Sequence, residues 1–83
     1  MKFEELSPAE QKIATELARD RGYRYGIKFE CRHVNGTEWK DFGAPLYFKS
    51  ADEVGPFMRS FTTEVLRQVW VVVLPKSLGK VAA

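Results

Sequence analysis

Apolar residues at helical spacing mark an amphipathic helix near the start of the chain. The residues that share this spacing are Leu6, Ala9, Ile13 and Leu17. Ser7 and Glu10 match the capping-box pattern around Pro8, a residue that suits the first position of a helix. Gly22 is a typical residue just after a helix end. The pattern predicts a helix over residues 8–21, with a mixed-charge outer face.

The apolar period then changes to two, which is typical of a strand with one covered face. The apolar parity comprises Tyr23, Tyr25, Ile27, Phe29 and Cys31. The polar parity carries Arg24, Lys28, Glu30 and Arg32. This alternation predicts a long strand that begins at Tyr23, in a sheet that is covered on one face only.

A hairpin signal follows this strand. Asn35-Gly36 favours a tight turn, because both residues tolerate a positive φ. We therefore expect a second strand to run back over residues 38–42. After an interruption at residues 43–45, the segment 46–48 is either a third short strand or an extended lead-in to the next helix.

The register of this hairpin follows from the length of its loop. A two-residue loop places Arg32 opposite Trp39 on the outer face of the sheet. It also places Glu30 opposite Asp41, and like charges in this position repel each other. We therefore expect the register to slip at a bulge near Lys40 or Asp41.

The second helix begins with another capping-box pattern, Ser50 with Glu53. Pro56 lacks the amide donor and clashes with the carbonyl four residues earlier, so we do not expect it inside a helix. The expected segments are a single turn over residues 51–54, a break at Gly55 and the main helix over residues 56–67.

The segment 69–74 contains four valines and a tryptophan and is apolar at both parities, which favours an inner strand. Pro75 ends it. Residues 76–83 have no periodicity, and we expect a mobile basic tail after a single domain of residues 1–75. The predicted fold is α+β, in the order α-β-β-(β)-α-β. Its mainly antiparallel sheet has three or four strands, with both helices on one face.

Composition limits the class of protein. The 83 residues fit one domain, and a net charge of +2 is too small for a protein that coats nucleic acid. The longest apolar run is far shorter than the roughly 20 residues that span a bilayer. Two acids near the start stand where a secretory signal has apolar residues. We therefore expect a soluble, cytoplasmic protein with no membrane contact.

Catalytic chemistry has one candidate, the pair Cys31 and His33, which share a strand parity. A cysteine nucleophile also needs a group that orients the histidine and a site for the developing oxyanion. The sequence provides neither, so we interpret Cys31 as an inert core thiol. With one cysteine and one histidine, there is no metal-ligand spacing. We expect a protein that is not an enzyme, without catalytic residues, cofactor or metal.

A basic and aromatic surface is the strongest functional signal. The predicted contact residues are Tyr23, Arg24, Tyr25, Lys28, Arg32 and Trp39. Such a face suits either a protein interface or a strand of nucleic acid, and it is also the composition of an ordinary solvated strand face. Glu30 among the cations and a row of valines on the open face favour protein contact, including contact within a homodimer. We therefore expect a protein partner, and keep a nucleic-acid-binding protein as the alternative.

In size and element layout, the chain resembles the small α+β proteins with which phages and mobile elements block host defence complexes, anti-CRISPR proteins among them. The resemblance covers the whole chain and involves no signature motif. It implies an inhibitor that acts by occupying a surface on another protein.

Overall fold

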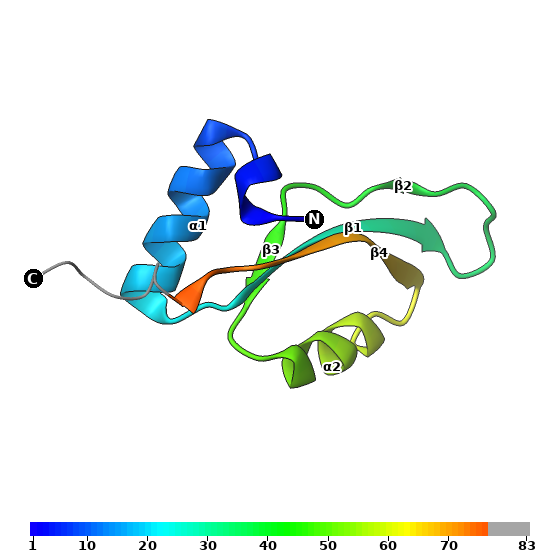
Figure 1. Cartoon of the computed structure of the whole chain (residues 1–83). Coiled ribbons are helices and arrows are strands. Elements are labelled where there is room, and N and C mark those ends of the chain that lie inside the picture. Colours follow the sequence, from blue (N-terminus) through cyan, green and yellow to red (C-terminus); the bar gives the residue numbers. More distant parts are fainter. Residues whose placement is uncertain (77–83) are drawn as a thin grey trace, which may run out of the picture.

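The computed structural model describes residues 1–76 and has one central strand, β1 (Tyr25–His33) (Figure 1). β4 (Glu64–Val73) pairs antiparallel with β1 along its whole length. β2 (Lys40–Asp41) and β3 (Leu46–Phe48) also pair antiparallel with β1. The first part of β1 pairs with both β3 and β4, so these two strands flank it. The α+β class and the antiparallel sheet are confirmed.

The first helix, α1 (Pro8–Arg21), agrees with the prediction at both ends. The Glu10 amide donates to the Ser7 hydroxyl at 3.2 Å, and the Ser7 amide donates to the Glu10 carboxylate at 3.1 Å. Gly22 adopts a left-handed conformation with φ of 72°. A short 3₁₀ turn, η1 (Phe3–Glu5), precedes α1.

The two helices cover opposite faces of the sheet (Figure 1). Ala14 and Ala18 of α1 are buried in one cluster with Val72. On the other face, Val54 of α2 (Val54–Arg59) is buried in a second cluster with Ile27. Successive strand residues point to opposite faces, so β4 is apolar at both parities because each face has its own helix. The prediction that both helices share one face is wrong.

β4 is also an edge strand, not the inner strand that its composition suggested. Within the described residues it pairs only with β1. Val69 and Val73 are about half exposed, at 49% and 58%. Val72, by contrast, is fully buried beneath α1. The expected row of valines on an open face is therefore interrupted.

The second helical segment is shorter than predicted. A 3₁₀ turn, η2 (Ala51–Glu53), leads directly into α2, which ends at Arg59. Pro56 lies in the first turn of α2, where backbone amides have no partner within the helix, so its missing amide costs no hydrogen bond. Gly55 lies inside α2, so the predicted break at this residue is wrong. The predicted helix over residues 56–67 is therefore wrong in its second half. Residues from Glu64 onward belong to β4, because their pairing with β1 buries Leu66 in the core.

The hairpin has the register that a two-residue loop predicts, without the expected slip. Its hydrogen-bonded turn, however, spans residues 33–36, where the Gly36 amide donates to the His33 carbonyl, and neither Asn35 nor Gly36 has a positive φ. Glu30 lies opposite Asp41 despite their like charges. Each carboxylate has a cation beside it, because Lys28 pairs with Asp41 and Arg67 pairs with Glu30. The slip predicted at Lys40 or Asp41 is wrong, because these two ion pairs offset the repulsion between the carboxylates.

Irregularities occur elsewhere in the sheet. Residues 42–45 contain two more residues than the stretch of β1 that they face, and Gly43 within them has φ of 116°. On β4, the register changes by one residue at Val69. Segment 46–48 is strand β3, which settles the alternative that the sequence left open.

Two expectations concern features beyond the sheet. Apart from Lys76, the predicted mobile tail at residues 76–83 lies outside the described residues. In the described part of the chain, no helix is long and apolar enough to cross a membrane.

Gly26 provides a test of how tightly side chains pack on the face of the sheet that α1 covers. A β-carbon at this position would lie 2.9 Å from the Tyr47 ring and 3.0 Å from a Val72 methyl group. We expect Gly26→Ala to lower the free energy of unfolding by about 1–3 kcal/mol, since overpacking forces neighbours apart. Urea denaturation followed by circular dichroism measures this, and unchanged stability would contradict it.

The two serines at the capping-box patterns provide a matched comparison. Ser7 makes its cap hydrogen bond, whereas the Ser50 side chain makes none. We expect Ser7→Ala to lower the free energy of unfolding by about 0.5–2 kcal/mol. Ser50→Ala should change it by less than about 0.5 kcal/mol, as for an ordinary surface substitution. Equal losses in the same urea experiment would show that Ser50 also acts as a cap.

Candidate functional site

The six predicted contact residues do not form one surface. Tyr23 packs against the cluster beneath α1, whereas Tyr25 packs against the cluster on the opposite face. Arg24 lies near the C-terminal end of α1, and its Nε atom is buried without a hydrogen-bond partner in the described part of the chain. Lys28, Arg32 and Trp39 share one face of the sheet in the half that carries the hairpin, and among the six predicted residues only Arg32 and Trp39 are in contact there.

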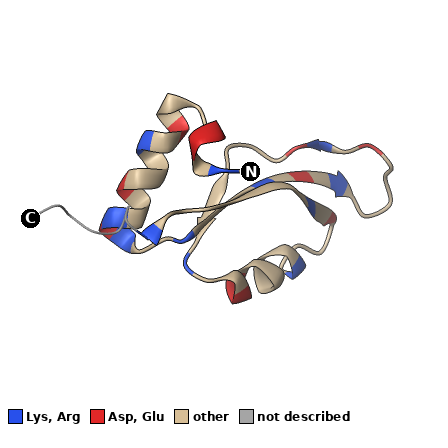
Figure 2. Cartoon of the chain, in the orientation of Figure 1, with Lys and Arg blue, Asp and Glu red and all other residues tan. Residues whose placement is uncertain are grey.

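These three residues belong to a group that we call the ladder face. Its members are Lys28, Glu30, Arg32, Trp39, Asp41 and Arg67. Cross-strand partners point to the same side of a sheet, so β1, β2 and β4 all contribute side chains to this face. Figure 2 shows charges of both signs along these strands.

Two ion pairs neutralise much of the ladder face. Lys28 pairs with Asp41 and also donates to the Gly43 carbonyl, and this pairing lowers the pKa of Asp41. The Arg67 guanidinium lies 2.8 Å from the Glu30 carboxylate. The Arg67 side chain is 51% exposed, so this pair adds little to stability. Its main effect is to fix where the guanidinium lies.

Trp39 lies against two guanidinium groups. The central carbon of Arg67 is 4.1 Å from the centre of the indole ring, and that of Arg32 is 5.3 Å away. Arg32 also donates to the carbonyls of His33, at 3.2 Å, and Gly36, at 3.1 Å. Arg32 therefore holds the hairpin turn, and the indole is kept in place by cations from two strands.

Sequence reasoning missed Arg67 because it assigned this residue to a helix. The signal that could have found it is the run of β-branched residues Thr62, Thr63 and Val65, which favours a strand over a helix. Had the last strand begun there, its pairing with β1 would have brought Arg67 beside Glu30.

Cys31 and His33 line a hollow of about 600 Å³ near the hairpin turn, which Arg32 and Asp41 of the ladder face also line. Partial burial of the Cys31 thiol, together with the nearby Glu64 carboxylate, raises its pKa. The ring of His33 is engaged as well, because its Nδ1 accepts the Asn35 amide at 3.1 Å. The thiol is therefore held in its protonated form, which is the less nucleophilic one.

Within residues 1–76, no group of three or more histidine, cysteine, aspartate or glutamate side chains is placed to hold a metal ion.

Comparison of the chain with models of protein families, with curated proteins and with solved structures finds no match. The ladder face itself offers a fixed indole, two guanidinium groups and two ion pairs.

The raised pKa of Cys31 gives a reactivity test. At pH 8 we expect iodoacetamide to alkylate the native protein several-fold more slowly than the urea-unfolded protein, because less thiolate is present. The folded state keeps a proton that the unfolded state loses. The free energy of unfolding therefore falls as the pH rises past the pKa of the unfolded thiol. Glu64→Gln should speed native alkylation by removing the carboxylate.

Asp52→Asn is the matched control for this test, because Asp52 is an exposed acid that does not line the hollow. We expect it to leave the alkylation rate unchanged. A native rate equal to that of the unfolded protein would contradict the assignment of a protonated thiol.

Proposed function

We propose that this protein is a non-enzymatic binding module that acts in the cytoplasm by occupying a surface on a partner protein through its ladder face. The observation that carries the proposal is the indole of Trp39, held against Arg32 and Arg67. Tryptophan and arginine are the residues that most often dominate binding energy at protein interfaces. Side chains already held in place lose less conformational entropy when a partner binds.

The balance of charge on the ladder face favours a protein partner over nucleic acid. Its cations stand beside two carboxylates, Glu30 and Asp41. A phosphate backbone would have to compete with these carboxylates for Lys28 and Arg67, and would itself be repelled by them. A protein partner can match both signs of charge around a central aromatic residue.

Blocking a partner is the mode of action that we infer, in line with the resemblance to phage-encoded inhibitors of the anti-CRISPR type. A small rigid module that covers a functional surface inhibits without chemistry of its own. Self-association is part of this proposal, because β4 is an edge strand with half-exposed Val69 and Val73.

Trp39→Ala tests the proposal directly. The partner is first identified by affinity capture with the wild-type protein, and the affinity is then measured by calorimetry. We expect Trp39→Ala to weaken binding by at least about 30-fold, as for a hot-spot residue. Arg67→Glu should also weaken it, because the new carboxylate repels Glu30 and leaves one side of the indole uncovered.

Lys12→Ala is the matched control, because Lys12 is an exposed cation on α1, away from the ladder face. It should change the affinity by less than about twofold. Circular dichroism must show that each variant keeps its fold. Equal affinity of Trp39→Ala and wild type would show that the ladder face is not the interface.

Salt dependence separates the protein partner from the alternative, nucleic acid. We expect no tight binding to random single- or double-stranded oligonucleotides at physiological salt. Binding to phosphates weakens by about 0.7–0.9 in log K per contact for each unit of log salt. A protein interface centred on Trp39 should respond less, because burial of apolar surface is not screened. Submicromolar, steeply salt-dependent oligonucleotide binding would overturn the proposal.

A further inference from the structure

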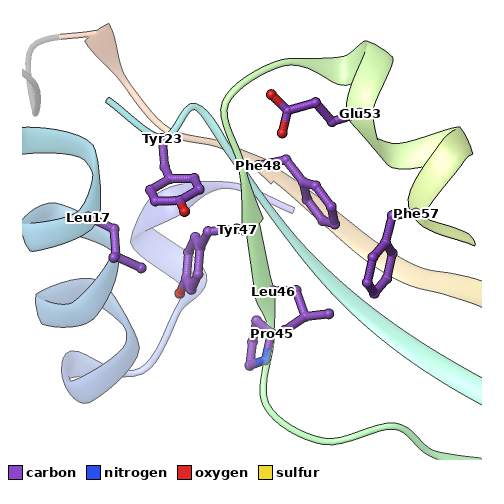
Figure 3. Close-up of a pocket in the computed structure, with 8 residues that line it drawn as sticks. All are labelled: Leu17, Tyr23, Pro45, Leu46, Tyr47, Phe48, Glu53 and Phe57. Carbon is purple, nitrogen blue, oxygen red and sulfur yellow. The ribbon is translucent and has the colours of Figure 1, made fainter. Parts of the chain in front are cut away.

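A cleft of about 510 Å³ lies beside β3, between α1 and α2 (Figure 3). Its lining is apolar and aromatic with one carboxylate, and consists of Leu17, Tyr23, Pro45, Leu46, Tyr47, Phe48, Glu53 and Phe57. None of these residues belongs to the ladder face, although both surfaces are built on the same sheet. The cleft is therefore a separate surface.

The cleft follows the outer edge of β3. Four successive residues, 45–48, line it, although successive strand residues point to opposite faces of a sheet. A hollow that touches both faces must pass around the edge of the strand. Within the described residues β3 pairs only with β1, so this edge has no partner strand.

The backbone of Tyr47 faces this free edge. The Phe48 carbonyl accepts the Arg24 amide at 2.9 Å and is therefore directed toward β1. Backbone groups of neighbouring strand residues point to alternate sides, so the amide and carbonyl of Tyr47 point away from β1. They are a donor and an acceptor available to a further strand.

Two apolar walls flank the edge, because the helices lie on opposite faces. Tyr47 lies on the same side of β3 as Leu17 and Tyr23, and forms the α1 wall (Figure 3). Phe48 and Phe57 lie on the other side and form the α2 wall (Figure 3). An extended chain along β3 would direct its alternate side chains toward the two walls in turn.

The two walls of the cleft differ in charge, because the Lys49 ammonium lies 5.8 Å from the centre of the Tyr23 ring, whereas the α2 side carries a carboxylate. Glu53 is the one charged residue that lines it, and the side chain is exposed on the α2 side. Glu53 makes no ion pair with any residue in the described part of the chain. A basic side chain whose aliphatic stem lies along Phe57 would complement this carboxylate.

We propose that this cleft binds an extended peptide segment of a partner protein, which adds a strand to the free edge of β3. The segment carries apolar side chains against the α1 wall and a basic side chain beside Glu53. Main-chain hydrogen bonds to Tyr47 provide affinity, and the two walls provide specificity. This site does not depend on the function proposed for the ladder face.

The test uses the peptide acetyl-Val-Arg-Val-Leu-Val-amide and the ¹⁵N-labelled protein. In antiparallel addition the central valine pairs with Tyr47, while the arginine and leucine face the α2 wall. We expect amide chemical-shift changes to cluster at residues 45–48 and 53–57. Hydrogen exchange of the Tyr47 amide should slow when the peptide is bound.

Two altered peptides separate strand addition from simple apolar contact. N-methylation of the central valine removes the amide that would donate to Tyr47 and should weaken binding by about tenfold, as for a lost hydrogen bond that leaves a group unpaired. Glutamate in place of arginine should also weaken binding, through repulsion by Glu53. Equal binding of the N-methylated peptide would overturn strand addition.

Protein variants test the charge and the independence of the site. Glu53→Gln should weaken binding of the arginine peptide by about two- to fivefold, as for an exposed ion pair. The matched control Asp52→Asn and the ladder-face variant Trp39→Ala should leave binding unchanged. Because the two sets of variants act on different surfaces, a negative result for peptide binding at the cleft is distinguishable from a negative result for partner binding at the ladder face.

Three results would contradict the proposal. The first is no shift at millimolar peptide, and the second is a set of shifts along β4 instead of β3. The third is that a higher protein concentration displaces the peptide and changes the amide chemical shifts of the same cleft residues. That result would identify a second copy of the chain as the occupant.

Discussion

Hydrogen bonding along both edges of β1 is the constraint on which the rest of this structure depends. β4 covers one edge completely, and β2 and β3 share the other. Each helix is held by side chains on one face of this ladder: α1 through Val72, and α2 through Ile27 and Phe29. Both binding surfaces also follow from it, since the ladder face lies across β1 and the cleft lies along a strand paired with it.

The parts of the fold that could be predicted are those set by neighbouring residues. Ser7, Glu10 and Gly22 determine the ends of α1 through contacts within a few positions. The register of the hairpin also agrees with the one that a two-residue loop at Asn35-Gly36 predicts, although the hydrogen-bonded turn lies at residues 33–36. The expected slip is wrong because it considers Glu30 and Asp41 without the cations beside them. The cations that offset their repulsion are Lys28 and Arg67, and Arg67 lies on a strand distant in the sequence. Local signals could not provide that partner.

The candidate site was predictable to the same extent. Arg32 meets Trp39, and Lys28 lies on the same face of the sheet, because all three lie on one hairpin with a predictable register. Tyr25 was lost from the site because its side chain faces the other side of the sheet. Arg67 was missed because helical spacing and strand pairing compete in residues 62–67, and only the long-range pairing with β1 decides between them. The cleft depends on the placement of the helices on opposite faces, which strand periodicity alone does not reveal.

The β1–β4 pairing joins two segments separated by most of the middle of the chain, and this has a consequence for synthesis on the ribosome. Contacts between distant residues form slowly, because a long loop must close before they yield any free energy. α1 and the hairpin can form while the C-terminal strand is still in the exit tunnel. During that interval β1 presents an unpaired edge and an incompletely covered apolar face with Ile27 and Phe29, which is the kind of surface that chaperones bind and that aggregates recruit. β4 emerges after β1, β2 and β3, and its pairing with β1 ends this exposure.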